Sequence, residues 1–205
     1  MDDLVEQLGL LTTSSNRLIV LDLNGLLIFR VFDREKTKFE KHLEVSTKVN
    51  EFHVWKRPHL DDFLDWLLDH FSVGVWSSAM HKNVDALIEW TFGPERRKRL
   101  VFEWDQSKCP KEEHPVHKHK PLFLKPLSLV WESFPEWNES NTLLVDDSPL
   151  KAKRNPEHLL FSPSEWSIET ESGKAELRQE GVIRKFLQDL FEWKDDVASF
   201  VKNKK

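Results

Sequence analysis

The sequence predicts an α/β fold in which a mostly parallel β-sheet lies between layers of helices. Short apolar runs rich in branched residues, typical of strands buried on both faces, occur at several places along the chain. Between them lie longer segments whose apolar residues recur at helical spacing. Strands that alternate with helices pair in parallel, because each helix returns the chain to the end of the sheet where the next strand begins.

The first strand of this sheet is expected at 17–23, where RLIVLDL forms an almost unbroken apolar run. Residues 1–16 precede it as an N-terminal extension with the pattern of a short amphipathic helix. Weak alternation over 27–57 predicts a small insert of two or more short strands around a loop. We expect 17–203, including this insert, to form a single domain.

Two helices and a second strand are expected next. Pro58 suits a first helical turn, and the apolar residues after it share one helical face as far as Phe71. SVGVWSS at 72–78 predicts a buried strand, and the pattern after it indicates a helix that is over by Gly93. The remaining expected elements are a strand at 99–104, an irregular loop at 106–121, a short element and a helix within 123–134, a strand at 142–147, a mostly irregular segment at 148–170 with a short strand at 158–161, and a helical C-terminal part with an apolar stripe from 182 to 191.

Composition and charge narrow the class of protein. The 205 residues include 30 Lys and Arg against 35 Asp and Glu, a formal net charge of −5, which disfavours a general nucleic-acid coat. No apolar run approaches the ~20 residues that span a bilayer, and the acidic N-terminus is unlike a secretory signal. The single cysteine, Cys109, excludes an internal disulfide and favours a reducing compartment. We therefore expect an intracellular protein of the nucleus or cytoplasm, with no membrane partner and no direct nucleic-acid partner.

Polar side chains follow three of the expected strands. Asp22 ends the first strand, Ser77 ends the second, and Asp146 and Asp147 end the strand at 142–147, while Lys125 precedes that strand in LFLKPLS. The carboxyl ends of parallel strands share one edge of the sheet, where ligands bind in open α/β folds, so these side chains are expected to converge on one crevice. Taken singly, each motif also has a plain interpretation, since Asp at a strand end and Asp-Ser-Pro are common in turns.

Together these side chains have the chemistry of phosphoryl transfer. A carboxylate such as Asp22 can attack phosphorus and form an aspartyl phosphate. Asp22, Asp146 and Asp147 offer the oxygen ligands that Mg²⁺ prefers. A hydroxyl and an ammonium group, from Ser77 and Lys125, can hold the remaining phosphate oxygens and stabilise the charge that develops on them.

Five motifs in order make the chain similar to one known family. They are DLNGL (22–26), KRPHLDDFL (56–64), VWSSA (75–79), LKPLS (124–128) and VDDSP (145–149). From about residue 17 to about residue 200 the chain resembles the C-terminal-domain phosphatase branch, NIF-like and small phosphatases, of the haloacid dehalogenase superfamily. The resemblance implies a three-layer, Rossmann-like haloacid-dehalogenase fold. It also implies magnesium-dependent removal of phosphate from phosphoserine or phosphothreonine in proteins, notably the tail repeats of polymerase II.

The same resemblance implies roles for particular residues. It implies that Asp22 is the nucleophile and also binds magnesium. Asp147 would be a further metal ligand, with Asp146 beside it or behind it, and Asn24 would offer its backbone carbonyl to the metal. Ser77 and Lys125 would bind the phosphate.

The chain departs from the family pattern at Asn24, where the family has a carboxylate that acts as general acid and base. A neutral amide can do neither, and the loss of such a group typically costs ~10²–10⁴-fold in rate. Leu26 also replaces the usual threonine. One interpretation is a weakened phosphatase that recruits another acid, such as Asp147 or His59. A second is a catalytically inactive pseudophosphatase that binds phosphopeptides or partners, and a third is deamidation of Asn24 before Gly25, which would restore the carboxylate.

Three further features leave two interpretations each. The loop at 109–119 contains one cysteine and three histidines, and indicates either a zinc site or, as the better match to its irregular spacing, a solvated loop beside the cleft. The basic run 96–99 is typical of a docking or nuclear-address patch, or of a helix end whose cations offset the macrodipole. Arg57 and His59 at a helix N-terminus indicate an anion site or an ordinary helix entry.

Overall fold

A sheet of five parallel strands forms the centre of the molecule, which the computed structural model describes over residues 15–204. The strand order is β10-β9-β1-β5-β6, and every neighbouring pair is parallel, which confirms the predicted fold class. Most of the helix expected over 1–16 lies outside the described residues, and Ser15 and Asn16 begin β1. The strands are Ser15–Leu21 (β1), Phe71–Trp76 (β5), Leu100–Trp104 (β6), Thr142–Val145 (β9) and Leu160–Phe161 (β10).

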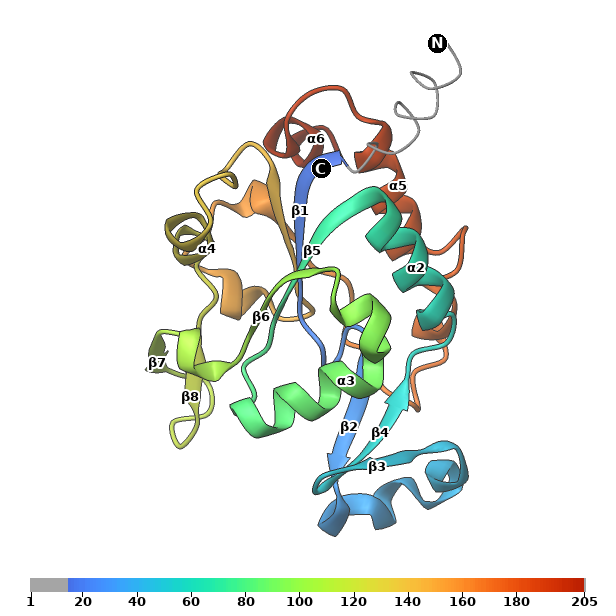
Figure 1. Ribbon diagram of the computed structural model, residues 1–205. Coiled ribbons are helices and arrows are strands. Elements are labelled where there is room, and N and C mark those ends of the chain that lie inside the picture. Colours follow the sequence, from blue (N-terminus) through green and yellow to red (C-terminus); the bar gives the residue numbers. More distant parts are fainter. Residues whose placement is uncertain (1–14, 205) are drawn as a thin grey trace.

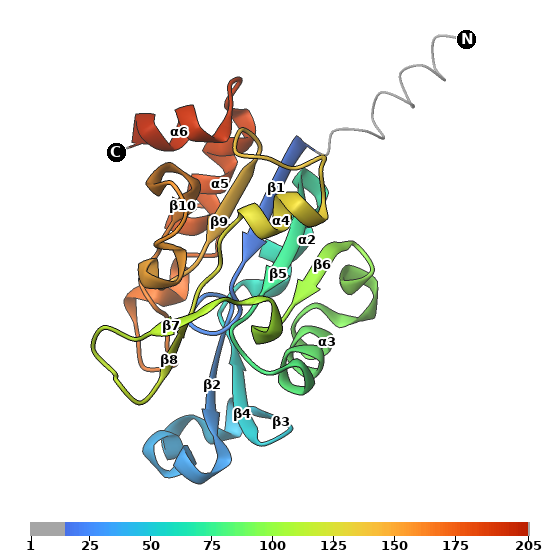
Figure 2. The ribbon, with the colours of Figure 1, turned by 90° about the vertical axis from the view of Figure 1, so that its left-hand side faces the viewer.

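Helices cover both faces of this sheet. Figure 1 and Figure 2 show α2 and α5 on one face of β1 and β5, and α4 on the opposite face. Residues Leu18 to Leu21 of β1 are fully buried between these layers, as their unbroken apolar run predicts. The helices are Leu60–His70 (α2), His81–Arg97 (α3), Ser128–Ser133 (α4), Val182–Glu192 (α5) and Val197–Lys204 (α6).

The insert is a small antiparallel sheet with the strand order β2-β4-β3. Its strands are Ile28–Phe32 (β2), Thr47–Val49 (β3) and Phe52–Lys56 (β4), and Figure 1 shows it beyond one end of the central sheet. The link between β2 and β3 was expected to be a loop but is largely 3₁₀-helical from Asp33 to Val45, with a break at Phe39. Aromatic contacts hold it, since the Phe39 ring packs edge-on against Phe29 with the ring centroids 5.2 Å apart.

Two helices differ from the predicted bounds. The regular helix of α3 breaks at Gly93, as predicted, because Gly93 takes a positive φ of 70°; a further helical turn that the sequence did not predict then runs from Pro94 to Arg97. The C-terminal part is also not one helix, because α5 and α6 are separate. Asp196 starts α6 by accepting a hydrogen bond from the N–H of Ser199 (2.6 Å), which is the role of a helix cap.

The segment 106–121 is more regular than its three prolines predict. It contains a 3₁₀ turn at Gln106–Lys108 and the strand Lys111–Glu113 (β7), which pairs with Pro121–Phe123 (β8). Pro121 is tolerated at the start of an edge strand, where no N–H is needed for the ladder. This ribbon is highly charged and only one of its faces meets the protein, so the sequence shows no clear alternation over it.

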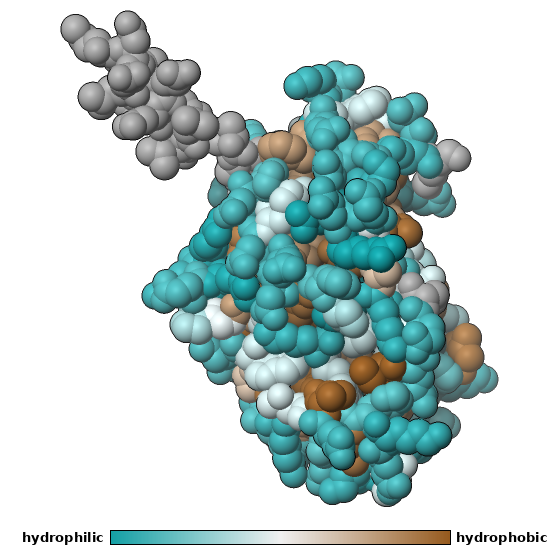
Figure 3. Space-filling model, turned by 90° about the vertical axis from the view of Figure 1, so that its right-hand side faces the viewer, coloured by the Kyte–Doolittle hydropathy of each residue, from teal (hydrophilic) through white to brown (hydrophobic). Residues whose placement is uncertain are grey.

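The basic run at 96–99 is used within the molecule. Arg96 contacts Asp61 and Asp65 at 2.8 and 2.6 Å, and Arg99 contacts Asp69 at 2.8 Å. The acidic face of α2 and the basic residues at and just after the end of α3 thus pair with each other, an internal role that neither interpretation of the run had named. Figure 3, which shows the side of the molecule that carries α2 and α5, is mostly hydrophilic with scattered apolar residues. Within residues 15–204, no helix combines the length and apolar character that crossing a membrane requires.

Candidate active site

Three strands of the central sheet end side by side, at the edge nearest the insert (Figure 1). The residue just after each strand still donates its backbone N–H to the neighbouring strand or its extension, so its side chain is held in a fixed position at this edge. These bonds run from Asp22 to the carbonyl of Val145 (3.0 Å), from Ser77 to that of Trp104 (2.8 Å) and from Asp146 to that of Phe161 (3.2 Å).

The ammonium group of Lys125 joins two of the predicted site carboxylates. Its Nζ lies 2.6 Å from Oδ2 of Asp146 and 3.1 Å from Oδ1 of Asp22, and all three side chains are almost completely buried. Asp147 follows Asp146 and completes the acidic group. Ser77 lies at the same edge and is 4% exposed, but its Oγ accepts a hydrogen bond from the N–H of Ala79 (3.2 Å).

A second lysine, Lys151, enters the same group of carboxylates. Its Nζ donates a short hydrogen bond to Oδ2 of Asp22, and lies 3.2 Å from Oδ1 of Asp146 and 3.7 Å from Oδ1 of Asp147. Lys151 belongs to the 3₁₀ turn Pro149–Ala152, directly after the Asp-Asp-Ser-Pro motif. The sequence analysis missed it, because lysines in such turns are usually solvated and the turn itself has no recognisable spacing.

The two lysines keep Asp22 ionised. Burial acts to raise the pKa of Asp22, but the charges of Lys125 and Lys151 outweigh it and hold this pKa below its usual range. Burial, opposed by Lys151 and reinforced by Asp22 and Asp146, raises the pKa of Asp147 to about 7. The Oδ1 atom of Asp147 is buried and accepts no hydrogen bond from residues 15–204. The site therefore combines one anionic carboxylate between two ammonium groups with a second carboxylate whose hydrogen bonding is incomplete.

The loop that carries Asn24 is built around a glycine. Gly25 has a positive φ of 83°, and a Cβ atom there would lie 2.6 Å from Oδ2 of Asp147, so only glycine fits. The side-chain oxygen of Asn24 accepts a hydrogen bond from the backbone N–H of Arg30 (3.0 Å), which connects the loop to β2 of the insert. Asn24 thus holds the chain in shape beside Asp22, but its amide offers no titratable proton.

Arg57 joins this loop to Gly173 and Glu176, which lie far away in the sequence. Its guanidinium is fully buried and donates to the carbonyls of Leu26 and Gly173 (2.9 Å each) and to Oε2 of Glu176 (2.5 Å). Since all three of its nitrogens are used, the structure supports a structural role for Arg57 and not the anion site that the sequence left open. His59, at the start of α2, has φ 66° and makes no capping hydrogen bond through its side chain.

The donor set suits a magnesium ion. Asp22, Asp146 and Asp147 each offer a carboxylate oxygen, and these oxygens lie within 4.8 Å of one another. Hard oxygen ligands of this kind are those of Mg²⁺ sites, and the incompletely bonded Asp147 oxygen leaves one ligand position open. Among residues 15–204 these aspartates are the one group of three or more metal-binding side chains, so the zinc alternative for the loop 109–119 receives no support. Cys109 is buried, with its Sγ facing the carbonyls of Ser77 and Asp105.

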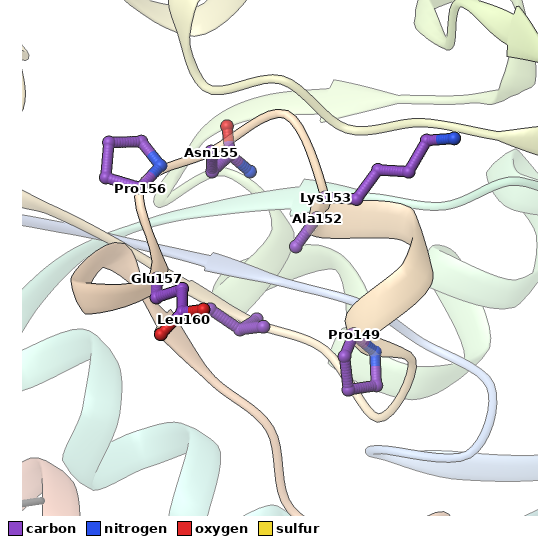
Figure 4. Close-up of a pocket in the computed structure, with 7 residues that line it drawn as sticks. All are labelled: Pro149, Ala152, Lys153, Asn155, Pro156, Glu157 and Leu160. Carbon is purple, nitrogen blue, oxygen red and sulfur yellow. The ribbon is translucent and has the colours of Figure 1, made fainter.

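A surface pocket is lined by both ends of the 3₁₀ turn Pro149–Ala152 and by the segment that follows it (Figure 4). The site carboxylates do not line it, and Figure 4 shows the Lys153 side chain pointing away from the other lining residues. Its lining residues are Pro149, Ala152, Lys153, Asn155, Pro156, Glu157 and Leu160. The pocket therefore borders the turn that positions Lys151 and not the predicted reaction centre.

Comparison with known proteins places the fold and the family of this chain. The solved structure of Fcp1, described as an essential RNA polymerase II CTD phosphatase, has the same haloacid-dehalogenase-like fold, with a TM-score of 0.53 at 14% identity over 98% of this chain and 55% of that chain. Residues 17–197 match the model of the NLI interacting factor-like phosphatases, and the chain belongs to that family.

Two curated relatives are similar in sequence. An FCP1 homology domain-containing protein of Schizosaccharomyces pombe is 29% identical over 152 residues, covering 70% of this chain and 59% of the relative. A CTD phosphatase-like protein of Invertebrate iridescent virus 3 is 26% identical over 155 residues, covering 72% of this chain and 83% of the relative. The chain thus spans little more than half the length of the yeast relative and of Fcp1.

Proposed function

We propose that this protein is a magnesium-dependent phosphatase of phosphoserine or phosphothreonine in proteins, and that it acts through a phosphate bound to Asp22. The observation that carries the proposal is the buried Asp22 carboxylate held ionised between Lys125 and Lys151 at the carboxyl edge of the sheet. In the first step a carboxylate oxygen of Asp22 attacks phosphorus, and the bond between phosphorus and the serine oxygen breaks. In the second step water attacks the same phosphorus, so that phosphate leaves and the carboxylate is regenerated.

Other residues of the site would stabilise these steps. Lys125 and Ser77 would hold the phosphate oxygens, since an ammonium and a hydroxyl donate to developing negative charge. Asp22, Asp147 and the carbonyl of Asn24 would hold magnesium, with Asp146 beside them. When bound, the metal would neutralise charge on the phosphate oxygens.

Asn24 leaves both steps without a proton-transfer group, and the effect on the first step depends on the leaving group. The departing serine oxygen needs a proton in the first step, and the attacking water must lose one in the second. The amide of Asn24 supplies neither function. An aryl phosphate such as p-nitrophenyl phosphate has a leaving group that needs no proton, so its first step escapes the deficit while its second step does not.

We therefore expect a burst with p-nitrophenyl phosphate and Mg²⁺ in a rapid-quench experiment. Wild-type protein should release up to one p-nitrophenol per active site quickly and then turn over slowly, because the aspartyl phosphate accumulates. Asn24→Asp keeps the acceptor for the Arg30 N–H and restores the acid–base group, so its steady-state rate should rise ~10²–10⁴-fold. Asp22→Asn should show neither burst nor turnover.

A second candidate is a pseudophosphatase that binds phosphopeptides or partner proteins without turnover. Asn24 favours it, and so does the occupation of the acidic group by Lys151. If wild type and Asp22→Asn behave alike while only Asn24→Asp turns over, the native chain is not an enzyme and this second function is the correct one. Fluorescence anisotropy with a labelled phosphopeptide then measures the binding directly.

The substrate and location are part of the same proposal. The relative from the iridescent virus is named a CTD phosphatase-like protein, and Fcp1 is described as an RNA polymerase II CTD phosphatase. We infer a phosphorylated protein segment of that kind as substrate, in the nucleus or cytoplasm. The free thiol of Cys109 supports a reducing compartment.

A further inference from the structure

We propose that the ammonium group of Lys151 is an internal cation that competes with Mg²⁺ for the carboxylate group of Asp22, Asp146 and Asp147. The chain would then bind divalent cations weakly as long as Lys151 occupies the group. This inference rests on the proposed function only for the identity of the metal. It concerns a residue that lies outside all five motifs of the resemblance.

The contacts of Lys151 carry the proposal. Its Nζ touches the same three carboxylates whose oxygens lie close enough together to share one cation. It faces Oδ2 of Asp22 and Oδ1 of Asp146, whereas Lys125 faces the opposite oxygen of each. The two lysines therefore do not duplicate each other. Lys125 binds the completely buried side of the carboxylates, and Lys151 binds the partly exposed side, where it also contacts Asp147.

Charge balance leads to the same conclusion. Three carboxylates and two ammonium groups leave one net negative charge when all are ionised. Without Lys151 two negative charges would remain, which one divalent cation would neutralise. Buried charges of one sign are stable only when opposite charges meet them, so Lys151 supplies part of what a metal would otherwise provide.

Lys151 is also placed so that it can leave. Its backbone is fixed, because its N–H donates to the carbonyl of Ser148 (3.1 Å) and its carbonyl accepts from the N–H of Lys125 (2.8 Å). Its side chain is 17% exposed, whereas that of Lys125 is completely buried. The ammonium of Lys151 thus reaches the carboxylates from the solvent side and has a path back to water. Metal binding and the position of this side chain are therefore coupled, and each must weaken the other.

The test is a direct measurement of Mn²⁺ binding, followed by the loss of the electron paramagnetic resonance signal of the free ion. Lys151→Met should bind Mn²⁺ roughly tenfold or more tightly than wild type. Lys153→Met is the matched control, because Lys153 is a neighbouring lysine whose contact is with Glu112 and not with the acidic group. Its Mn²⁺ affinity should equal that of wild type. Adding Asp147→Asn to Lys151→Met should abolish the gain.

Each result decides the proposal. An equal or weaker affinity of Lys151→Met compared with wild type would overturn it, and so would an equal gain in Lys153→Met. Circular dichroism checks that the variants are folded, and Lys151→Gln, which can still donate to Asp22, replaces Lys151→Met if the latter does not fold. Because Mn²⁺ binding needs no turnover, a gain in a chain without phosphatase activity supports this inference while refuting the proposed function. Turnover by wild type, together with no gain of Mn²⁺ affinity in Lys151→Met, supports the proposed function while refuting this inference.

Discussion

The buried guanidinium of Arg57 leads to a quantitative prediction for stability. Arg57→Met keeps most of the side-chain volume but removes every hydrogen-bond donor. The carbonyls of Leu26 and Gly173 lose their partner, and the Glu176 carboxylate, which is 16% exposed, loses its counter-ion. Removing one member of a buried ion pair typically costs about 3–5 kcal/mol, since the polar groups that remain keep their desolvation penalty.

This free energy corresponds to a large change in melting temperature. A domain of this size loses about 2–4 °C per kcal/mol, so the Tm of Arg57→Met should fall by roughly 6–20 °C in a calorimetric scan. Glu176→Gln keeps an acceptor for the guanidinium and should cost less. Arg154→Met is the matched control, because Arg154 is 50% exposed and its ion pair with Glu112 is worth about 1 kcal/mol or less.

The comparison of the two arginines can refute the reasoning. If Arg57→Met lowers the Tm no more than Arg154→Met does, the guanidinium does not stabilise the loop after Asp22. The double variant Arg57→Met with Glu176→Gln tests the pair itself. Its loss of stability should be smaller than the sum of the two single losses, because the second substitution removes the carboxylate that the first left unpaired.

Three further predictions concern single positions. Gly25→Ala should lower the free energy of unfolding more than Gly93→Ala, because both glycines have positive φ but only at Gly25 would a Cβ meet another group, Asp147; equal losses of stability in urea titrations would contradict this. In the folded protein Asn24 should deamidate more slowly than in urea, because its side-chain oxygen and the following N–H are both hydrogen-bonded, and a one-dalton gain at equal rates in peptide mass spectrometry would show otherwise. Burial raises the pKa of the Cys109 thiol, so a thiol reagent at pH 8 should label it far more slowly in the native than in the unfolded protein, and rapid native labelling would place the thiol at the surface.

The parts of the fold that follow from local pattern were predictable. The apolar run RLIVLDL predicted a strand buried on both faces, and β1 is the central strand of the sheet. The helical spacing after Pro58 identified the buried face of α2 in the same way. The ends of the strands were harder to predict, because the expected strands at 17–23 and 142–147 included Asp22 and Asp146, which lie just outside β1 and β9.

The parts that depend on distant contacts were not predictable. Lys151 and Arg57 are cations whose contacts follow from partners elsewhere in the chain, and a single sequence shows Lys151 only as a charged turn residue and Arg57 only as a charged residue at a helix N-terminus. The hairpin of β7 and β8 has no apolar alternation to mark it. The continuation of α3 beyond Gly93 depends on one positive φ that allows the chain to turn and start again at Pro94.

The contacts of Arg57 also determine when the site can be completed. Gly173 and Glu176 follow Arg57 by 116 and 119 residues. At synthesis rates of about 5–20 residues per second, Arg57 leaves the ribosome roughly 6–24 s before Gly173 and Glu176 do. Until then Arg57 has no carboxylate partner, and the loop after Asp22 is not linked through Arg57 to Gly173 and Glu176. A nascent chain that is released or cleaved between Pro149 and Gly173 therefore contains every residue of the five motifs and still lacks the contacts of Arg57 with Gly173 and Glu176.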